Sequence, residues 1–322
     1  MSQQSNEAPE VAFLGPHGTY SHQAALKWVG EQDAKLVACS TIKETIEWGR
    51  HRSQMLTPPG KLVVVPISNS VQGPVTETLI SLGNSNLFGE SALQIIDELD
   101  LTISHALVVS SGTRRAEEDL SRIRVVRSHP QALGQCSGFI SSHLPHAIQE
   151  ETNSTAEAVT LLDSEDAAAI ASELSAKISG AQVLFRGIQN SSENVTRFFV
   201  AANNAEKSSV LTPLKHIRDE CQNDRTVLRS LYRIRLENQS NQSSFERFTN
   251  LDPNLEVENI HAVPGCSSTF LLEVSQHSQN ENSSISLSDP TSMICNHIHA
   301  SHPCAQIDRL GTWYGAQSKR TE

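Results

Sequence analysis

Short apolar runs alternate with helical patterns through the first two hundred residues. The runs lie at residues 11–14, 35–38, 62–65, 101–109, 124–126, 183–185 and 198–200. Most lead into a turn of Gly, Ser, Thr or Asn and then into a segment whose apolar positions recur three or four residues apart, as in an amphipathic helix. Strands that alternate with helices are typical of an α/β fold with parallel sheets, and this number of repeats predicts two lobes.

Capping residues predict where the helices of this region begin. Ser21 is placed to cap the first helix, and Thr41 with Glu44 has the spacing of a capping box. Ser128 is expected to cap a later helix that carries Pro130 in its first turn. Each start follows an apolar run, so the predicted helices begin at the carboxyl ends of predicted strands.

The pattern changes after residue 200. Polar residues 201–211 predict a boundary, and the segments beyond it that can serve as strands are 226–236, 255–260, 268–274 and 307–313. Runs rich in Asn, Ser and Gln lie at 238–250 and 275–288. Such runs cannot bury apolar surface, so they are interpreted as loops or disordered insertions.

Composition and charge narrow the classes of partner. Apolar residues make up 38% and charged residues 19%, which is enough for a core and too little charge for a disordered polyelectrolyte. The net charge of −11 argues against nucleic acid and anionic membranes, since both require a basic surface. Without an apolar run of ~18 residues or a signal-peptide pattern, the chain is predicted to be cytoplasmic and not associated with a membrane. The six scattered cysteines do not form the pattern of a disulfide framework.

Hydroxyl and amide side chains gather at four predicted turns between a strand and a helix. A helix N-terminus has unpaired N–H groups and the positive end of the helix dipole, so it binds anions without cationic side chains. One such hydroxyl usually only caps its own helix. Four turns that meet at the carboxyl ends of the strands favour a small polycarboxylate or phosphate ligand. The residues are Thr19, Tyr20, Ser21, Asn69, Ser70, Ser128, His129, Ser154 and Thr155.

No nucleotide-binding pattern accompanies these turns, because neither GxGxxG nor GxxxxGK[ST] is present. Another candidate pair, Thr196 and Arg197, stands where the last predicted strand of this region begins. A hydroxyl there can donate to a departing oxygen, and a guanidinium can clamp a carboxylate. In a regular strand the two side chains would point to opposite faces, and Arg197 would then pair with a protein carboxylate, the commoner fate of such arginines.

Six segments in order carry a resemblance to a known family. They are VAFLGPHGTYSHQAAL, VVVPISNSVQGPVTETL, SHPQALGQC, NSTAEAV, AAAIAS and ENVTRFFV. Over residues 11–202 the chain resembles the prephenate dehydratase family. The resemblance implies conversion of prephenate to phenylpyruvate, with loss of CO2 and water, in phenylalanine biosynthesis and without a metal or organic cofactor. It also implies a two-lobed α/β unit like that of periplasmic binding proteins, with the site in the cleft between the lobes.

The resemblance also implies roles for individual residues. The family's essential threonine lies in a Thr-Arg-Phe motif, which places it at Thr196, the expected donor to the leaving hydroxyl. Arg197 is then expected to clamp a carboxylate or support that clamp, Phe198 belongs to the substrate site, and the polar turns hold the carboxylates. The family usually has Glu where this chain has Ser68. This change either removes repulsion from an anion site or deletes a group that orients the substrate or donates a proton.

Three alternatives remain open at this point. They are an arogenate dehydratase, an enzyme like prephenate decarboxylase that retains the ring hydroxyl, and a non-catalytic ligand-binding module. The intact Thr196-Arg197-Phe198 motif favours dehydration over the last two.

The remainder of the chain resembles a divergent ACT domain, a small α+β module of the ferredoxin-like class that binds phenylalanine in many family members. The family's Gly-Ala-Leu loop is absent, and His261, Ala262, Val263 and Pro264 stand where a Ser-Arg-Pro motif is expected. A missing glycine at a close backbone approach and a missing arginine predict weak or no inhibition by phenylalanine.

The expected domain boundaries follow from these assignments. They are a disordered start at 1–10, a catalytic unit at 11–203, a linker at 204–224, an ACT-like domain at 225–315 and a tail at 316–322. The first lobe is expected at 11–100 and 184–203, and the second at 101–183. We expect a homodimer or a higher homo-oligomer.

One segment, CNHIHASHPC, combines residue types that suit zinc. They are Cys295, His297, His299, His302 and Cys304. Their spacing matches no common zinc pattern. A polar strand and loop with His297 and His299 on one face is therefore predicted rather than a metal site.

Overall fold

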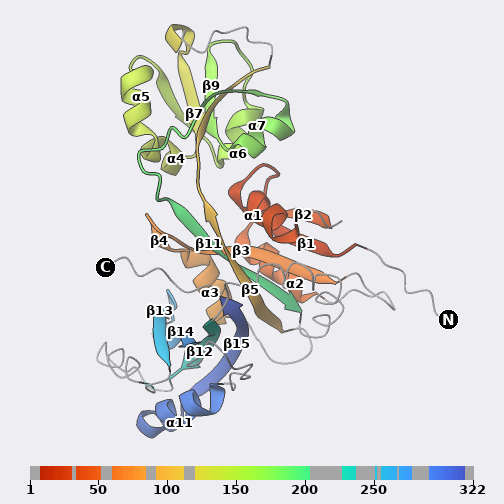
Figure 1. The fold of residues 1–322 in the computed structure, drawn as a ribbon, viewed down its shortest axis with the longest axis vertical. Helices are drawn as coiled ribbons and strands as arrows, with labels where there is room; N and C mark the ends of the chain where they lie inside the picture. Colours follow the sequence, from red (N-terminus) through yellow and green to blue (C-terminus); the bar gives the residue numbers. More distant parts are fainter. Residues whose placement is uncertain are drawn as a thin grey trace, which may run out of the picture.

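Two β-sheets organise the protein, in two lobes and a C-terminal unit arranged along one long axis (Figure 1). The computed structural model describes residues 8–30, 34–51, 60–84, 92–111, 120–203, 227–236, 251, 255–266, 268–277 and 290–315. The expected linker at 204–224, the tail at 316–322 and most of the polar insertions lie outside the described residues. The expected disordered start is corrected at Glu10, which already pairs with Lys35 and Lys61 in the first sheet.

The first lobe is an α/β unit around a mixed sheet. Its elements are β1 (Glu10–Leu14), α1 (Tyr20–Val29), β2 (Lys35–Cys39), α2 (Ile42–Arg50), β3 (Lys61–Asn69), β4 (Gly73–Pro74), α3 (Thr76–Asn84), β5 (Leu93–Thr102) and β11 (Val195–Asn203). The strands β2, β1 and β3 are parallel, as predicted, whereas β11 is antiparallel to both β3 and β5. One face of the sheet packs on α2 and α3 and the other on α1, so β3 is buried from both sides.

The second lobe repeats this layering on a smaller sheet. Its elements are β6 (Ala106–Val109), a 3-10 turn (Leu120–Arg122), β7 (Val125–Ser128), α4 (Pro130–Gln135), α5 (Ser137–His143), β8 (Ile148–Glu151), α6 (Thr155–Thr160), β9 (Ala167–Ala171), α7 (Glu173–Ser179) and β10 (Gln182–Arg186). The strand order is β10-β6-β9-β7-β8, with β9, β7 and β8 parallel. Helices α4 and α5 cover one face, and α6 and α7 cover the other.

The two crossings between the lobes differ from the expected positions. The single strand predicted over 101–109 is two strands, because β5 pairs with β11 in the first sheet while β6 pairs with β9 in the second. Ile103, Ser104 and His105 connect them. The chain returns after β10, which pairs with β6, so the expected boundary at 184 falls inside a strand of the second lobe.

The C-terminal unit is an antiparallel sheet with a helix on one face. Its described elements are β12 (Val227–Arg235), β13 (Glu256–Ala262), β14 (Thr269–His277), α11 (Thr291–Ser301) and β15 (Gln306–Gly315), and the strand order is β13-β14-β12-β15. Ile294 and Ile298 anchor the helix to the sheet. The four strands predicted after residue 225 are thus confirmed, and the arrangement agrees with an α+β unit of the ferredoxin-like class.

This unit is continuous with the first lobe. Gly311 on β15 pairs with Ile95 on β5, and through this pairing the strands of the C-terminal unit and of the first lobe form one ten-stranded sheet. A Cβ on Gly311 would lie 2.3 Å from the Ile95 carbonyl oxygen, so only glycine fits at this junction.

The histidine-rich segment is a helix rather than the predicted strand. Cys295, His297 and His299 lie on α11, where residues two apart do not share a face. In the part of the chain that the structure describes, no group of three or more His, Cys, Asp or Glu side chains could hold a metal ion. No helix in that part is long and apolar enough to cross a membrane.

Candidate active site

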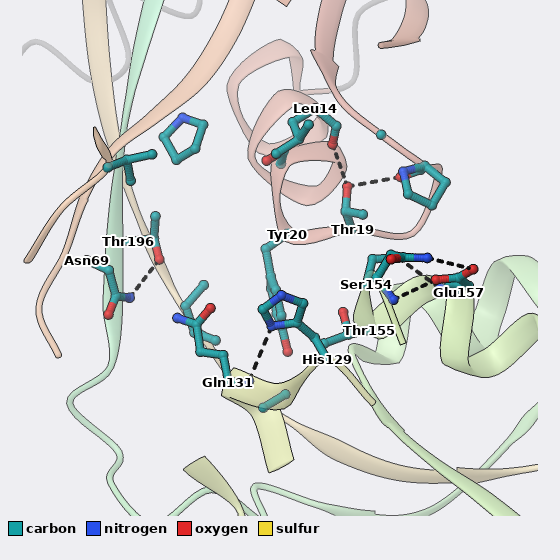
Figure 2. A pocket seen from close by; sticks show the side chains of 18 of the residues that line it. Leu14, Thr19, Tyr20, Asn69, His129, Gln131, Ser154, Thr155, Glu157 and Thr196 are labelled. Atoms are coloured by element: carbon teal, nitrogen blue, oxygen red, sulfur yellow. Dashed lines mark hydrogen bonds between the residues drawn. The ribbon is translucent and has the colours of Figure 1, made fainter. Parts of the chain in front are cut away.

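A cavity of about 730 Å³ lies between the two lobes (Figure 2). The first lobe contributes the β1–α1 turn, the end of β3 and the start of β11. The second lobe contributes the N-terminal ends of α4 and α6, and the crossing segments contribute Ile103, His105 and Asn194. The cavity therefore lies where the carboxyl ends of the strands of an α/β fold would place a ligand.

Three helices begin at this cavity. Their N-caps are Thr19 for α1, His129 for α4 and Ser154 for α6, and each cap side chain accepts a hydrogen bond from a backbone N–H of its own helix. The expected caps are therefore corrected. Helix α1 is capped by Thr19, two residues before Ser21, and α4 by His129, one residue after Ser128. The N-terminal ends of these three helices bring partial positive charge to the cavity without a cationic residue.

Neutral donors, not cations, line the cavity. Among the described lining residues there is no lysine or arginine. Glu157 provides a carboxylate, but it accepts hydrogen bonds from the Asn153 backbone N–H at 2.7 Å and from its side-chain amide at 3.3 Å. The hydroxyls of Ser21 and Thr155 also line the cavity, and neither has a hydrogen-bond partner among the described residues.

Thr196 lies at the cavity with its hydroxyl oriented by Asn69 (Figure 2). The Asn69 Oδ1 atom accepts hydrogen bonds from the backbone N–H groups of Val71 and Gln72 at 3.0 and 3.1 Å. The amide nitrogen must then face the other way, where it donates to Thr196 Oγ1 at 2.9 Å. Since Thr196 accepts from Asn69, its own proton remains available to a group in the cavity.

A chain of hydrogen bonds extends from Asn69 along the cavity to the other crossing. Asn69 donates to Asn194 Oδ1 at 2.7 Å, and Asn194 Nδ2 donates to Gln135 Oε1 at 3.1 Å. The same Gln135 oxygen lies 2.8 Å from His105 Nε2, which must therefore carry the proton. The Tyr20 hydroxyl lies 2.8 Å from the remaining ring nitrogen of His105 and 2.8 Å from the Ser104 carbonyl oxygen, and its single proton can be donated to either acceptor.

The electrostatic consequence of this chain is a set of neutral groups. His105 is 2% exposed, and burial lowers its pKa, so the ring is neutral at pH 7. Burial also raises the pKa of Tyr20. Gln135 Oε1 accepts both bonds, which orients the side-chain amide. Its amide nitrogen has no hydrogen-bond partner among the described residues, and Gln135 lines the cavity. It is a further neutral donor for an anion.

The structure brings together most of the residues expected at the site, but not all of them. The cavity is lined by Thr19, Tyr20, Ser21, Asn69, His129, Ser154, Thr155, Thr196 and Phe198. Three expected residues do not line it. Ser128 is fully buried and donates to the Ile170 carbonyl at 2.6 Å, whereas Ser70 bonds to the backbone of Glu193 and Val195.

Arg197 is the third residue that does not reach the cavity. Its guanidinium contacts Glu98 on β5 and Glu273 on β14, on the face of the sheet opposite Thr196. The expected clamp on a substrate carboxylate does not agree with this geometry, and the alternative of an ion pair with protein carboxylates does. The physical reason is the alternation of side chains along a strand.

The sequence reasoning missed Gln131, Gln135, Glu157, His105 and Asn194 at the cavity. Glu157 had a detectable signal, because Ser154 and Glu157 have the spacing of a capping box. Asn194 directly precedes β11 and lies in the same ENVTRFFV segment as Thr196. His105 and Gln135 had none, because their place depends on where the chain crosses between the lobes.

Comparisons with known proteins agree with this geometry. A family model described as prephenate dehydratase matches residues 11–206. The chain belongs to the prephenate dehydratase family. It is 35% identical over 213 residues to the bifunctional chorismate mutase/prephenate dehydratase of Enterobacter agglomerans, with 65% of this chain and 50% of that protein covered. This chain thus spans about half the length of the curated relatives it matches.

Several solved structures resemble nearly the whole chain. A prephenate dehydratase from Arthrobacter aurescens in complex with L-Phe matches with a TM-score of 0.70 at 23% identity, covering 95% of this chain and 90% of that one. GqqA, described as a novel type of quorum quenching acylase, matches with a TM-score of 0.68 at 19% identity, covering 97% of this chain and all of that one. At these identities the likeness concerns the fold, and it includes the C-terminal unit.

Two of the three departures from the prephenate dehydratase family have distinct places in the structure, and the third, the absent Gly-Ala-Leu loop, falls in a segment outside the described residues. Ser68 is adjacent to Arg197 in the β3–β11 ladder and does not line the cavity, because it alternates with Asn69 along β3. Val263, in the segment 261–264, is 2% exposed and packs on the first lobe, where a Cβ on Gly83 would lie 2.5 Å from it. Neither departure changes the lining of the cavity.

Proposed function

We propose that this protein is a prephenate dehydratase, a carbon–oxygen lyase that converts prephenate to phenylpyruvate, CO2 and water. The observation that carries the proposal is the hydroxyl of Thr196, which accepts from Asn69 at 2.9 Å and keeps its proton for a group in the cavity. Family membership over residues 11–206 and the set of neutral anion donors in the cavity support the same reaction.

The reaction breaks two bonds at opposite carbons of the ring. The bond to the ring carboxylate breaks, and its electron pair enters the ring as CO2 departs. The carbon–oxygen bond at the other ring carbon breaks as the ring becomes aromatic, and the departing hydroxide takes up a proton to leave as water. Thr196 would donate a hydrogen bond to this oxygen while negative charge develops on it.

The absence of lysine and arginine from the described lining fits this chemistry. An arginine beside the departing carboxylate would stabilise the ionised ground state more than a transition state in which that charge is leaving. Neutral donors such as Ser21, Thr155, Gln135 and the helix N-termini can hold the two carboxylates of prephenate with less ground-state stabilisation.

The test is turnover of prephenate at neutral pH, followed as phenylpyruvate above the uncatalysed background. Thr196→Val is expected to lower kcat by roughly 100-fold or more, as for loss of a transition-state donor. Thr196→Ser keeps the hydroxyl and should retain part of the activity. Thr102→Val is a matched control, since Thr102 is exposed on neighbouring β5 and does not line the cavity.

Each failure of this test has a separate meaning. A wild-type protein that forms no phenylpyruvate would refute the proposed function, and a Thr196→Val variant with nearly normal kcat would refute the role of Thr196. The same assay with arogenate, followed as phenylalanine, decides between the two dehydratase substrates. A non-aromatic product would identify a decarboxylase that keeps the ring hydroxyl.

A further inference from the structure

Arg197 links the strand that carries Thr196 to the C-terminal unit. Its Nε atom donates to Glu98 Oε2 on β5 at 2.7 Å, and its Nη1 atom donates to Glu273 Oε2 on β14 at 2.9 Å. The third nitrogen, Nη2, contacts both carboxylates. The side chain of Glu273 is only 3% exposed, so this carboxylate is held away from water.

Further groups of the C-terminal unit hold Glu273 in this place. Asn259 on β13 donates to Glu273 Oε2 at 3.0 Å, and Arg229 on β12 lies 3.4 Å from Oε1. Arg229 also lies 3.3 Å from Glu98. The neighbouring positive charges lower the pKa of Glu273, chiefly through its hydrogen bond and ion pair with Arg197, despite burial. Glu273 is therefore an ionised, oriented partner of Arg197.

The apolar contacts fix the distance between the two parts. Phe199 on β11 packs against Trp313 on β15 with ring centroids 5.3 Å apart, and both belong to a core cluster shared by the first lobe and the C-terminal unit. Gly311 on β15 pairs with Ile95 on β5, where the strands of the two parts meet in one sheet. These contacts thus fix the position of the Glu273 carboxylate beside β11.

The backbone ladder is irregular at the same point. The register of β11 against β3 shifts between Arg197 and Phe198, which pair with Ser68 and Pro66. Proline has no N–H to contribute to a ladder. On the β3 side the backbone next to Thr196 therefore lacks regular pairing, whereas on the other side β11 pairs in regular register with β5 from Val195 to Val200. The Arg197 side chain is a further anchor, directly adjacent to the shift. Ser68, which pairs with Arg197 in the ladder, has no carboxylate, and the guanidinium instead contacts the carboxylates of Glu98 and Glu273.

A buried ion pair contributes little net stability compared with apolar residues of similar size. Its advantage is defined geometry, because a guanidinium held by two carboxylates fixes the backbone from which it extends. We propose that Glu273 of the C-terminal unit is a positioning residue for the reaction, which acts through Arg197 to keep the Thr196 hydroxyl in the cavity. This inference rests on the proposed function.

The experiment compares Glu273→Gln with Asp308→Asn in the full chain. Asp308 on β15 is also largely buried and paired with an arginine, Arg233, but it does not contact Arg197. The measurements are kcat and KM for prephenate, together with amide hydrogen exchange over 195–203. We expect Glu273→Gln to lower kcat about tenfold with KM within twofold, because a misplaced donor weakens only the transition state. Its exchange over 195–203 should be faster, and Asp308→Asn should change neither measurement.

Glu273→Asp provides a second variant if Glu273→Gln does not fold. It keeps the charge but shortens the side chain, so kcat should lie between those of wild type and Glu273→Gln. Equal kcat and equal exchange in wild type and the Glu273 variants would overturn the inference, as would the same loss in Asp308→Asn. If the wild type does not act on prephenate, the proposed function fails, and hydrogen exchange over 195–203 still tests the position of β11.

Discussion

Ser172 of the second lobe donates a hydrogen bond from its hydroxyl to the carbonyl oxygen of Gly18 in the first lobe, at 2.9 Å. Ser172 is 2% exposed and caps α7, so its own position is fixed. This contact adds a non-covalent connection between the lobes to the two crossing segments. It lies beside Thr19, the N-cap of α1, and so it bears on the shape of the cavity.

Gly18→Ala should push the lobes apart. Gly18 has a φ of +94°, and an added Cβ would lie 2.6 Å from Ser175 Oγ and 3.1 Å from Ser175 Cα. Gly30→Ala is the matched control, since Gly30 has a φ of +67° but nothing within 4 Å of an added Cβ. Both should lose about 1–3 kcal/mol of unfolding free energy, because an alanine rarely adopts a positive φ. Gly18→Ala should lose more and also raise KM, as measured by urea denaturation and kinetics. Equal losses and an unchanged KM would contradict the interlobe contact.

Asn69→Asp should remove the hydrogen bond that the Asn69 amide donates to the Thr196 hydroxyl, and with it the orientation of that hydroxyl. Aspartate can still accept from Val71 and Gln72, but its second oxygen would face Thr196 and accept the proton that is meant for the substrate. We expect kcat to fall by roughly 100-fold, as for other losses of a preorganised donor. Asn296→Asp makes the same change at an exposed position on α11, away from the cavity, and should leave kcat unchanged. A kcat for Asn69→Asp within a few-fold of wild type would contradict the assigned polarity.

Gln135→Glu should weaken substrate binding. The substitution places a negative charge where a neutral amide faces the cavity, against a substrate with two carboxylates. Repulsion of this kind at about 4 Å is worth roughly 1–4 kcal/mol, so KM should rise about tenfold or more. Gln182→Glu adds the same charge at an exposed position on β10 and should leave KM unchanged. Similar KM values for both variants would show that Gln135 does not meet the substrate.

The stability of the protein should fall as the pH is lowered from 6.5 to about 4. Burial lowers the pKa of His22 to about 4, and its Nδ1 atom accepts from the Gly18 N–H at 3.0 Å. Within this window the unfolded chain binds a proton at His22 and the folded chain does not, which favours unfolding by on the order of 1–3 kcal/mol. His22→Asn keeps an acceptor at the same place and should flatten the dependence measured by urea denaturation. The exposed His51→Asn is the control, and equal slopes in both variants would contradict the assignment.

Phenylalanine should inhibit turnover weakly or not at all. Where the family's Ser-Arg-Pro motif is expected, Val263 is buried against Gly83 of the first lobe, and no arginine is present to bind a carboxylate. The measurement is prephenate turnover at increasing phenylalanine concentration. Strong inhibition at micromolar phenylalanine would contradict this prediction.

The fold of the first two hundred residues could be predicted because its information is local. The apolar run of β3 and the spacing of Thr41 and Glu44 each specify an element within a few residues, and the structure confirms the strand and the Thr41 N-cap. The Glu44 carboxylate accepts from the Ser40 N–H, one residue before the N-cap of the predicted capping box. Strand β5 could not be predicted in the same way. It carries Asp97 and Glu98, whose side chains accept hydrogen bonds from Trp28 and Arg197, far away in the sequence.

At the site, too, features specified by nearby residues could be predicted, whereas features that depend on distant residues could not. The TRF motif places Thr196 from sequence alone, and the polar turns indicate the helix N-termini. The direction of Arg197 could not be known, because it depends on strand register and on Glu273, which lies 76 residues later. The same applies to His105, whose partners Tyr20 and Gln135 come from different lobes.

The single core shared by the first lobe and the C-terminal unit limits how this protein can be divided. A fragment ending at Asn203 would expose to water the faces of Phe199, Val63 and Ile95 that now pack near Trp313 and Leu310. Such a fragment would contain every residue that lines the cavity, but its exposed apolar surface would favour aggregation. A shortened or transferred catalytic unit would therefore have to include the C-terminal unit together with the two lobes.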